Sequence, residues 1–160
     1  MIRDTPTLEI ITREKGHVIA LARDFTMETR HQIGALFDDF FGAGYEIANV
    51  IPDGAYGVSF SGDDQGAFRY GVGFAVDPVP ATRPEGTCVI TLSGGDYAVL
   101  RAFGPVADLP TRFDWIFNTW LPKADVAQRD GAVFEVYPDD ARNGAEGMAY
   151  EIWVPVAAKA

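Results

Sequence analysis

The chain has 160 residues, of which 48% are hydrophobic and 22% are charged, and its formal net charge is -10. This composition is typical of one globular domain and excludes a disordered or fibrous chain. The charge argues against direct nucleic-acid binding, which needs clustered Lys and Arg, and it would concentrate cationic molecules instead, although acidic proteins also gain solubility. Cys88 is the only cysteine, so no internal disulfide can form and a reducing cytoplasm is the expected compartment.

The sequence also lacks the features of membrane proteins, of exported proteins and of metal sites. No apolar run approaches the roughly 20 residues of a membrane helix, and residues 1–6 lack the apolar core of a signal peptide. We therefore expect neither membrane insertion nor export. His17 and His31 have no Cys, Asp or Glu at ligand spacing, so a metal site is not supported and no cofactor is expected.

The first half alternates between strand and helix patterns. Its predicted elements, in the order strand, strand, helix, strand, strand, cover residues 8–12, 17–23, 29–41, 56–60 and 68–76. The first two strands read as one long or broken strand. Turn signals at 14–16, 52–54 and 62–66 separate the elements.

A proline-rich connector at 77–84 ends this half, because three prolines in eight residues exclude a central strand or a helix interior. Beyond it the same order recurs. The predicted elements are strands at 88–92 and 97–102, a helix at 107–121, and strands at 133–137 and 149–156. An offset of about 80 residues places Phe37 on Ile116 and Tyr70 on Tyr150.

This duplication predicts an α+β fold made of two βαββ units. The units cover about 8–76 and 87–156 within a single domain spanning 1–160, and a pseudo-twofold axis relates them. Their strands are expected to join in one antiparallel sheet or in two abutting ones, with both helices on the same side. A groove between the helices follows, and small-molecule pockets tend to form at such interfaces.

Four segments of the second half resemble the GyrI-like effector-binding domains of bacteria, namely 95–105, 115–122, 134–137 and 150–156. Residues 68–74 also suit the third strand of these domains, so the resemblance covers essentially the whole chain. It implies a central channel that accepts drug-like, often flat and cationic, compounds. Members occur fused to AraC-type or MerR-type activators, but no residues remain here for a helix-turn-helix, so a stand-alone form that cannot bind an operator by itself is expected.

Glu135 is the leading site candidate, because the run Phe134-Glu-Val-Tyr137 places a carboxylate in an apolar strand. Phe134 and Val136 face the opposite side, whereas Tyr137 shares the face of Glu135. The resemblance implies that this Glu lies in the ligand channel, where a carboxylate against aromatic walls attracts a cation. The alternative is that strand alternation simply aims Glu135 at solvent.

Further aromatic side chains are candidates for the walls of the groove, although core packing demands the same spacing. They are Phe113 and Trp120 on the second helix and Tyr56, Phe60, Tyr70 and Trp153 on hairpin strands. Periodicity does not separate wall from core, and for Trp120 it favours the core.

Two functions from different classes follow. The first is a binding module that senses or sequesters a small hydrophobic, cationic or flat aromatic compound, or that binds a protein partner such as gyrase or a regulator. The second is a hydrolase of cyclopropane-bearing or similar reactive compounds, an activity implied by the same resemblance. Glu135 would then act as a general base beside Tyr137. Binding is preferred because it needs only a complementary charge and walls.

Overall fold

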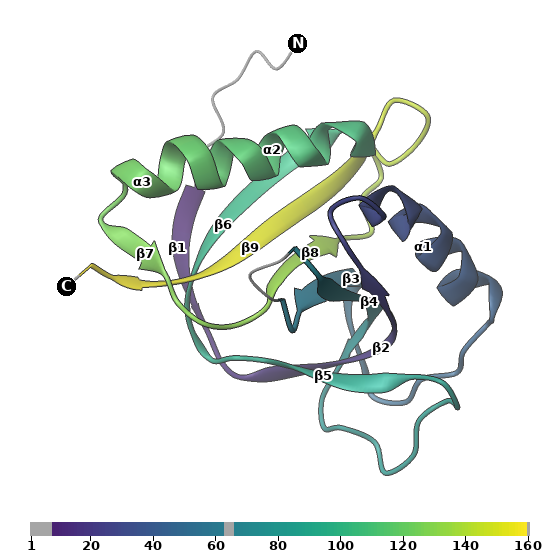
Figure 1. Ribbon diagram of the computed structural model, residues 1–160. Helices are drawn as coiled ribbons and strands as arrows, with labels where there is room; N and C mark the ends of the chain where they lie inside the picture. Colours follow the sequence, from purple (N-terminus) through teal and green to yellow (C-terminus); the bar gives the residue numbers. More distant parts are fainter. Residues whose placement is uncertain (1–7, 63–65, 160) are drawn as a thin grey trace.

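The computed structural model describes residues 8–62 and 66–159, which form an α+β fold with helices packed against a large sheet (Figure 1). The strands are β1 (Leu8–Arg13), β2 (Gly16–Phe25), β3 (Val50–Phe60), β4 (Phe68–Val76), β5 (Cys88–Leu92), β6 (Gly95–Gly104), β7 (Val126–Gln128), β8 (Val133–Tyr137) and β9 (Met148–Ala158). The helical segments are η1 (Arg30–Gln32), α1 (Ile33–Gly42), η2 (Val106–Asp108), α2 (Leu109–Trp115), η3 (Ile116–Trp120) and α3 (Leu121–Lys123). The duplicated βαββ fold predicted from the sequence is confirmed.

Eight strands follow one antiparallel path in the order β1-β6-β9-β8-β3-β4-β2-β5, and β7 pairs with β9 beside it. The β3–β8 pair joins the two repeats, and in it Gly57 lies opposite Glu135. The remaining pairs are duplicated, because β4 pairs with β2 and β3 as β9 pairs with β6 and β8. The pseudo-twofold axis therefore passes through the centre of the sheet, between β3 and β8.

The first strand of each repeat is broken, and its two pieces pair in different halves. β1 pairs with β6 of the second repeat, so that Leu8 lies opposite Leu100. β5 pairs in the same way with β2 of the first repeat, so that Leu92 lies opposite Gly16. The two repeats therefore interlock by exchanging their leading strands.

Apolar side chains pack in three clusters on the two faces of the sheet. On the helix face, the α1 cluster is built around Phe25, Leu36, Phe40, Tyr70 and Val72. On the same face, the α2 cluster is built around Ala98, Leu100, Leu109, Ile116, Tyr150, Ile152, Val154 and Val156. The opposite face carries the central cluster, whose largest members are Tyr56, Tyr97, Phe134 and Trp153. Figure 1 shows α2–α3 over β6 and β9, and α1 beside β4.

The second helix is continuous from α2 to α3 but widens in the middle, because η3 is a π-helical segment. Pro122 follows this segment, and a proline lacks an N–H and clashes with the carbonyl four residues earlier, which favours the wider turn. Such segments occur frequently at functional sites. Within the described part of the chain, no helix is both long and apolar enough to cross a membrane.

Two local features differ from the sequence predictions. The turn predicted at 52–54 is wrong, because these residues belong to β3, where a register shift between Val50 and Ala55 marks a β-bulge. Gly54 has φ +113°, and a Cβ there would overlap the backbone of Tyr137, so a glycine is required. The short strand β7 was not predicted. The turn predicted at 62–66 lies mostly on 63–65, outside the described residues.

Candidate functional site

Glu135 lies in β8 at the centre of the sheet and is 5% exposed. Its neighbours Phe134 and Val136 belong to the central cluster on the opposite face, as the alternation predicts. Its own partners are Tyr70 of the α1 cluster and Tyr137, which packs against the α2 cluster. The carboxylate therefore lies on the helix face at the boundary of the two clusters, which we call the seam.

Two tyrosine hydroxyls hold one oxygen of this carboxylate. Tyr70 Oη donates to Glu135 Oε1 at 2.7 Å, and Tyr137 Oη donates to the same atom at 3.0 Å. Glu135 Oε2 is also buried, yet it has no hydrogen-bond partner among the described residues. A buried acceptor without a partner costs about 1 to 3 kcal/mol, and more when it is charged. One oxygen of the carboxylate thus has neither a hydrogen-bond donor nor a cation beside it among the described residues.

The protonation of Glu135 is poised near neutral pH. Burial raises the pKa of its carboxyl from 4.5 to about 7, and the two tyrosine hydrogen bonds oppose that rise only in part. Burial, and then the charge of Glu135, raise the pKa of Tyr70 and of Tyr137 well above the usual value of 10. The tyrosines therefore remain neutral donors, while a cation beside Glu135 would shift its carboxyl to the ionised form.

Gly57 explains how Tyr70 reaches the carboxylate. It lies opposite Glu135 in the β3–β8 pair and is the counterpart of Glu135 in the first repeat. A Cβ at Gly57 would overlap the Tyr70 hydroxyl and would lie 3.3 Å from Glu135 Oε1. The missing side chain lets Tyr70 extend from β4 across β3 to β8. The axis consequently carries one carboxylate rather than two, which avoids repulsion between like charges.

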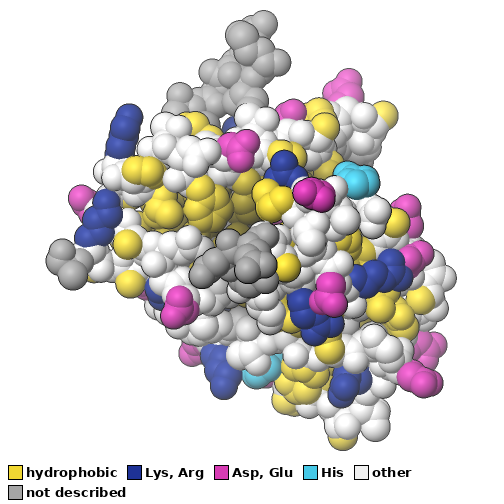
Figure 2. All heavy atoms as spheres, in the orientation of Figure 1, with side chains coloured by type: hydrophobic (Ala, Val, Ile, Leu, Met, Phe, Trp, Pro, Cys, Tyr) yellow, Lys and Arg dark blue, Asp and Glu magenta, His cyan; other side chains and the backbone are white. Residues whose placement is uncertain are grey.

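An aromatic side chain of α1 borders the seam, and further aromatic side chains of the second helix pack against the α2 cluster. The Phe37 ring on α1 lies 5.6 Å from that of Tyr137, edge to face, and 6.2 Å from that of Tyr70. On the second helix, Phe113 and Phe117 stack with centroids 6.5 Å apart. Trp120 is half-buried and packs against the α2 cluster. Figure 2 shows hydrophobic side chains gathered in a band beneath α2–α3.

The residues predicted to form the site separate onto two faces of the sheet. Glu135, Tyr137 and Tyr70 meet in the seam, and Phe113 and Trp120 lie half-buried in the α2 cluster. The other three lie on the opposite face, in or against the central cluster; they are Tyr56, Phe60 and Trp153. This second group therefore does not line the seam.

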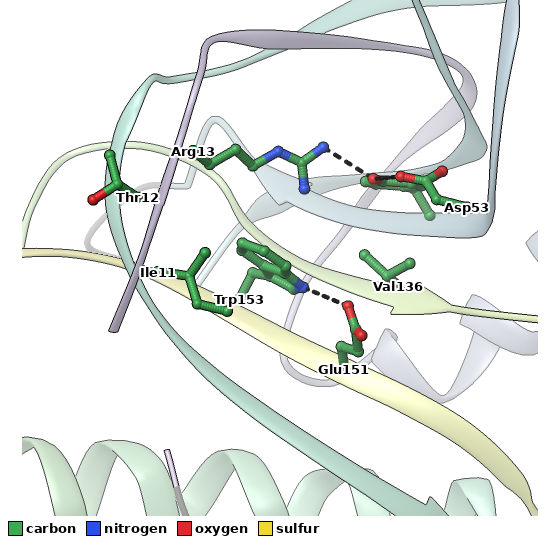
Figure 3. Close-up of a pocket in the computed structure, with 8 residues that line it drawn as sticks. Ile11, Thr12, Arg13, Asp53, Val136, Glu151 and Trp153 are labelled. Carbon is green, nitrogen blue, oxygen red and sulfur yellow. Dashed lines mark hydrogen bonds between the residues drawn. The ribbon is translucent and has the colours of Figure 1, made fainter. Parts of the chain in front are cut away.

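The second group borders two other cavities. Tyr56 and Trp153 line a cavity of about 340 Å³ (Figure 3), and Phe60 lines one of about 560 Å³.

Sequence reasoning missed Gly57 and Phe37 as members of the site. A glycine inside an alternating strand does signal close approach of another group, so Gly57 was recognisable in principle. In the parts of the chain that the structure describes, no group of three His, Cys, Asp or Glu side chains could hold a metal ion.

The order of the strands and helices defines a duplicated α+β domain with a carboxylate buried at its pseudo-twofold axis. The sequence matches the model of the GyrI-like small molecule binding domain over residues 6–157, and the chain belongs to this family. No curated protein sequence is significantly similar to it.

Three solved structures illustrate how widely the fold is shared. SAV2435 bound to tetraphenylphosphonium aligns with a TM-score of 0.75 and 16% identity over 94% of both chains. A putative bacterial transcription regulation protein from Staphylococcus aureus MU50 aligns with a TM-score of 0.68 and 18% identity, over 94% of this chain and 97% of that one. A hydrolase from Listeria innocua aligns with a TM-score of 0.55 and 12% identity, over 94% and 91%. At these identities the likeness shows the fold alone.

Proposed function

We propose that this domain senses or sequesters hydrophobic organic cations with flat aromatic groups, and that it binds them in the seam with Glu135 as the counter-charge. The observation that carries the proposal is the carboxylate itself. Glu135 is buried, its Oε2 has no partner among the described residues, and it forms no ion pair with any of them. Ionising such a group is costly without a cation, so a bound cation would stabilise it.

The chemistry of the seam suits a cation whose charge is spread over aromatic rings. Such a cation loses little hydration when it is buried. A positive charge about 5 Å from the carboxylate gains roughly 3 kcal/mol at an effective dielectric constant of about 20. The faces of Tyr70, Tyr137 and Phe37 add cation–π attraction. The shared fold with SAV2435, whose structure holds tetraphenylphosphonium, agrees with this choice of ligand class.

Access to the carboxylate involves α1. The Phe37 ring contacts both tyrosines that hold Glu135. We therefore expect a ligand that approaches Oε2 from the helix side to displace this ring. A phenylalanine side chain has few rotamers, and moving it costs far less than disrupting the sheet. Ligand entry is therefore expected to move Phe37 and to leave β8 and β3 in place.

The test is calorimetric titration near pH 8 with tetraphenylphosphonium, and with neutral triphenylphosphine oxide for comparison. The wild type is expected to prefer the cation, and Glu135→Gln is expected to weaken cation binding about 100-fold, which corresponds to the roughly 3 kcal/mol above. The control is Glu146→Gln, which removes the same charge from an exposed turn and is expected to bind like the wild type. Equal affinity of Glu135→Gln and wild type for the cation would refute the proposal.

A second candidate function is hydrolysis at the same carboxyl group. A pKa of about 7 and a partnerless Oε2 suit Glu135 as a general base that takes a proton from water. With an epoxide, the water oxygen would bond to a ring carbon as the C–O bond breaks, and the Tyr137 hydroxyl would protonate the released oxygen. The proton on Glu135 then returns to Tyr137. Turnover of a styrene oxide probe is expected to be lost in Glu135→Gln, and a wild type without turnover would exclude this candidate.

A further inference from the structure

The face of the sheet opposite the seam carries a cavity of about 340 Å³ (Figure 3). This volume lies at the lower end of the roughly 300 to 1,000 Å³ range of small-molecule sites. Four strands, β1, β3, β8 and β9, supply its walls. The charged side chains around it are Arg13, Asp53 and Glu151, and the apolar ones are Ile11, Val136 and Trp153.

Arg13 places its guanidinium group among the aromatic rings that border the cavity. The group lies 5.1 Å from the ring centroids of Phe134 and Trp153 and 5.5 Å from that of Tyr56. One terminal nitrogen donates to Tyr56 Oη at 2.9 Å. Arg13 forms no ion pair within residues 8–62 and 66–159. Figure 3 shows its other terminal nitrogen directed toward Trp153, so donors remain for an anionic group.

Asp53 supplies the opposite charge. It belongs to the bulged part of β3, and bulges commonly redirect a side chain next to a functional site. Its Oδ2 accepts a hydrogen bond of 2.5 Å from Tyr56 Oη, whereas its Oδ1 is buried and has no partner in the described part of the chain. The Tyr56 hydroxyl thus links Arg13 and Asp53, and both charged groups keep unused hydrogen-bonding capacity.

The pseudo-twofold axis relates this cavity to an equivalent place in the sheet, which serves as an internal control for these charges. Strand register and chain spacing identify the counterpart of each charged residue. Leu92 is the counterpart of Arg13, and Gly131 and Gly71 are the counterparts of Asp53 and Glu151. The other cavity, of about 560 Å³, is lined by uncharged residues of β3, β4, β5 and β8 and the adjoining loops, and Gly131 is the one of these three counterparts that lines it. The same fold therefore forms around uncharged residues, so the fold itself does not require the charges of the first cavity.

We propose that the first cavity binds a small zwitterion of the α-amino acid type with an apolar side chain. The carboxylate would pair with Arg13, whose planar donors suit carboxylate geometry, and the ammonium group would pair with Asp53. The side chain would lie against Ile11, Val136 and Trp153. Asp53 and Glu151 place two carboxylates in the lining, which disfavours a dianionic phosphate at Arg13.

Glu151 is already engaged and contributes mainly negative potential. Its Oε1 accepts from Trp153 Nε1 at 2.9 Å and its Oε2 from Arg101 Nε at 3.0 Å. The free capacity of the cavity is thus one cation, one carboxylate and an apolar surface, which matches the three parts of an amino acid such as leucine. The site is on the opposite face of the sheet from Glu135 and does not depend on the function of the seam.

The test uses L-alanine, L-valine, L-leucine and L-methionine, observed through the Trp153 indole resonance in NMR titrations. At least one is expected to bind more than tenfold tighter than its analogue without the ammonium group and its analogue without the carboxylate; for leucine these are 4-methylpentanoic acid and 3-methylbutylamine. Arg13→Lys and Asp53→Asn keep the size of the side chains and are each expected to weaken binding at least tenfold. Glu135→Gln is expected to leave it unchanged, which separates this site from the seam.

Three outcomes would overturn the proposal. The first is no response of the Trp153 resonance to any of the four amino acids at about 10 mM, which excludes even weak binding. The second is binding of the amino acid no tighter than that of its two analogues. The third is wild-type affinity in Arg13→Lys or Asp53→Asn. Thermal unfolding of each variant establishes that it is folded before titration.

Discussion

Replacing Glu135 with Gln should flatten the pH dependence of the unfolding free energy. Burial raises the pKa of this carboxyl from 4.5 to about 7 in the folded protein. Between these two pH values the folded state therefore holds a proton that the unfolded state has released. The stabilisation that this proton provides is fully present below about pH 4.5 and is lost as the pH rises through about 7. The loss amounts to about 3 kcal/mol, since each unit of pKa difference corresponds to about 1.4 kcal/mol.

Urea unfolding followed by circular dichroism from pH 4 to pH 8 measures this effect. Glutamine has no proton to lose, so the unfolding free energy of Glu135→Gln relative to the wild type should rise by about 3 kcal/mol across that range. The exposed-turn variant Glu146→Gln should keep the wild-type profile. If the Glu135→Gln and wild-type curves stay parallel, the carboxyl is not buried with a raised pKa and the reasoning is refuted.

Four other substitutions test the seam. Tyr70→Phe and Tyr137→Phe each remove a donor to Glu135 Oε1, so each should raise the pKa of Glu135 further, as measured by carbon NMR of its carboxyl group. Gly57→Ala places a methyl group on the Tyr70 hydroxyl and should lower the unfolding free energy by about 1 to 3 kcal/mol in urea. Phe37→Ala removes the ring that contacts both tyrosines and should speed association of tetraphenylphosphonium in stopped-flow experiments.

Each of these predictions has a result that would contradict it. A Glu135 pKa that falls or stays constant in both tyrosine variants would mean that the hydroxyls do not stabilise the ionised carboxylate. Wild-type stability of Gly57→Ala would show that Tyr70 does not pass over this glycine. An unchanged association rate in Phe37→Ala would show that the ligand reaches its site by another route, and the exposed-surface variant Phe41→Ala provides the matched control.

The duplicated fold was predictable because each repeat carries the same order of strand and helix patterns at a nearly constant offset. The interlocking of the repeats was not. The turn at 14–16 signals that the first strand breaks, but only tertiary pairing decides that β1 joins β6 while β2 joins β4. The sequence predicts a turn at 52–54 where the structure has a bulge, because Pro, Asp and Gly favour both and the choice depends on the partner strands.

The site was predictable only within a single strand. Alternation alone places Glu135 and Tyr137 on one face, and the structure has them there. Alternation does not reveal how β3 aligns with β8, and a shift of one residue reverses every side chain. The actual register puts Gly57 opposite Glu135 and sends Tyr56 to the far face. The contact between Tyr70 and Glu135 spans three strands, so it depends on sheet order, which no local pattern encodes.

The central claim is that a cation binds in the seam beside Glu135, and a crystal structure with tetraphenylarsonium tests it most directly. Arsenic scatters anomalously, so its position can be found independently of the surrounding density. We expect the arsenic within about 6 Å of Glu135 Oε2, the range over which an opposite charge acts on a carboxyl, with the Phe37 ring displaced. A fully occupied arsenic site on the opposite face of the sheet, with no peak between α1 and α2, would contradict the account.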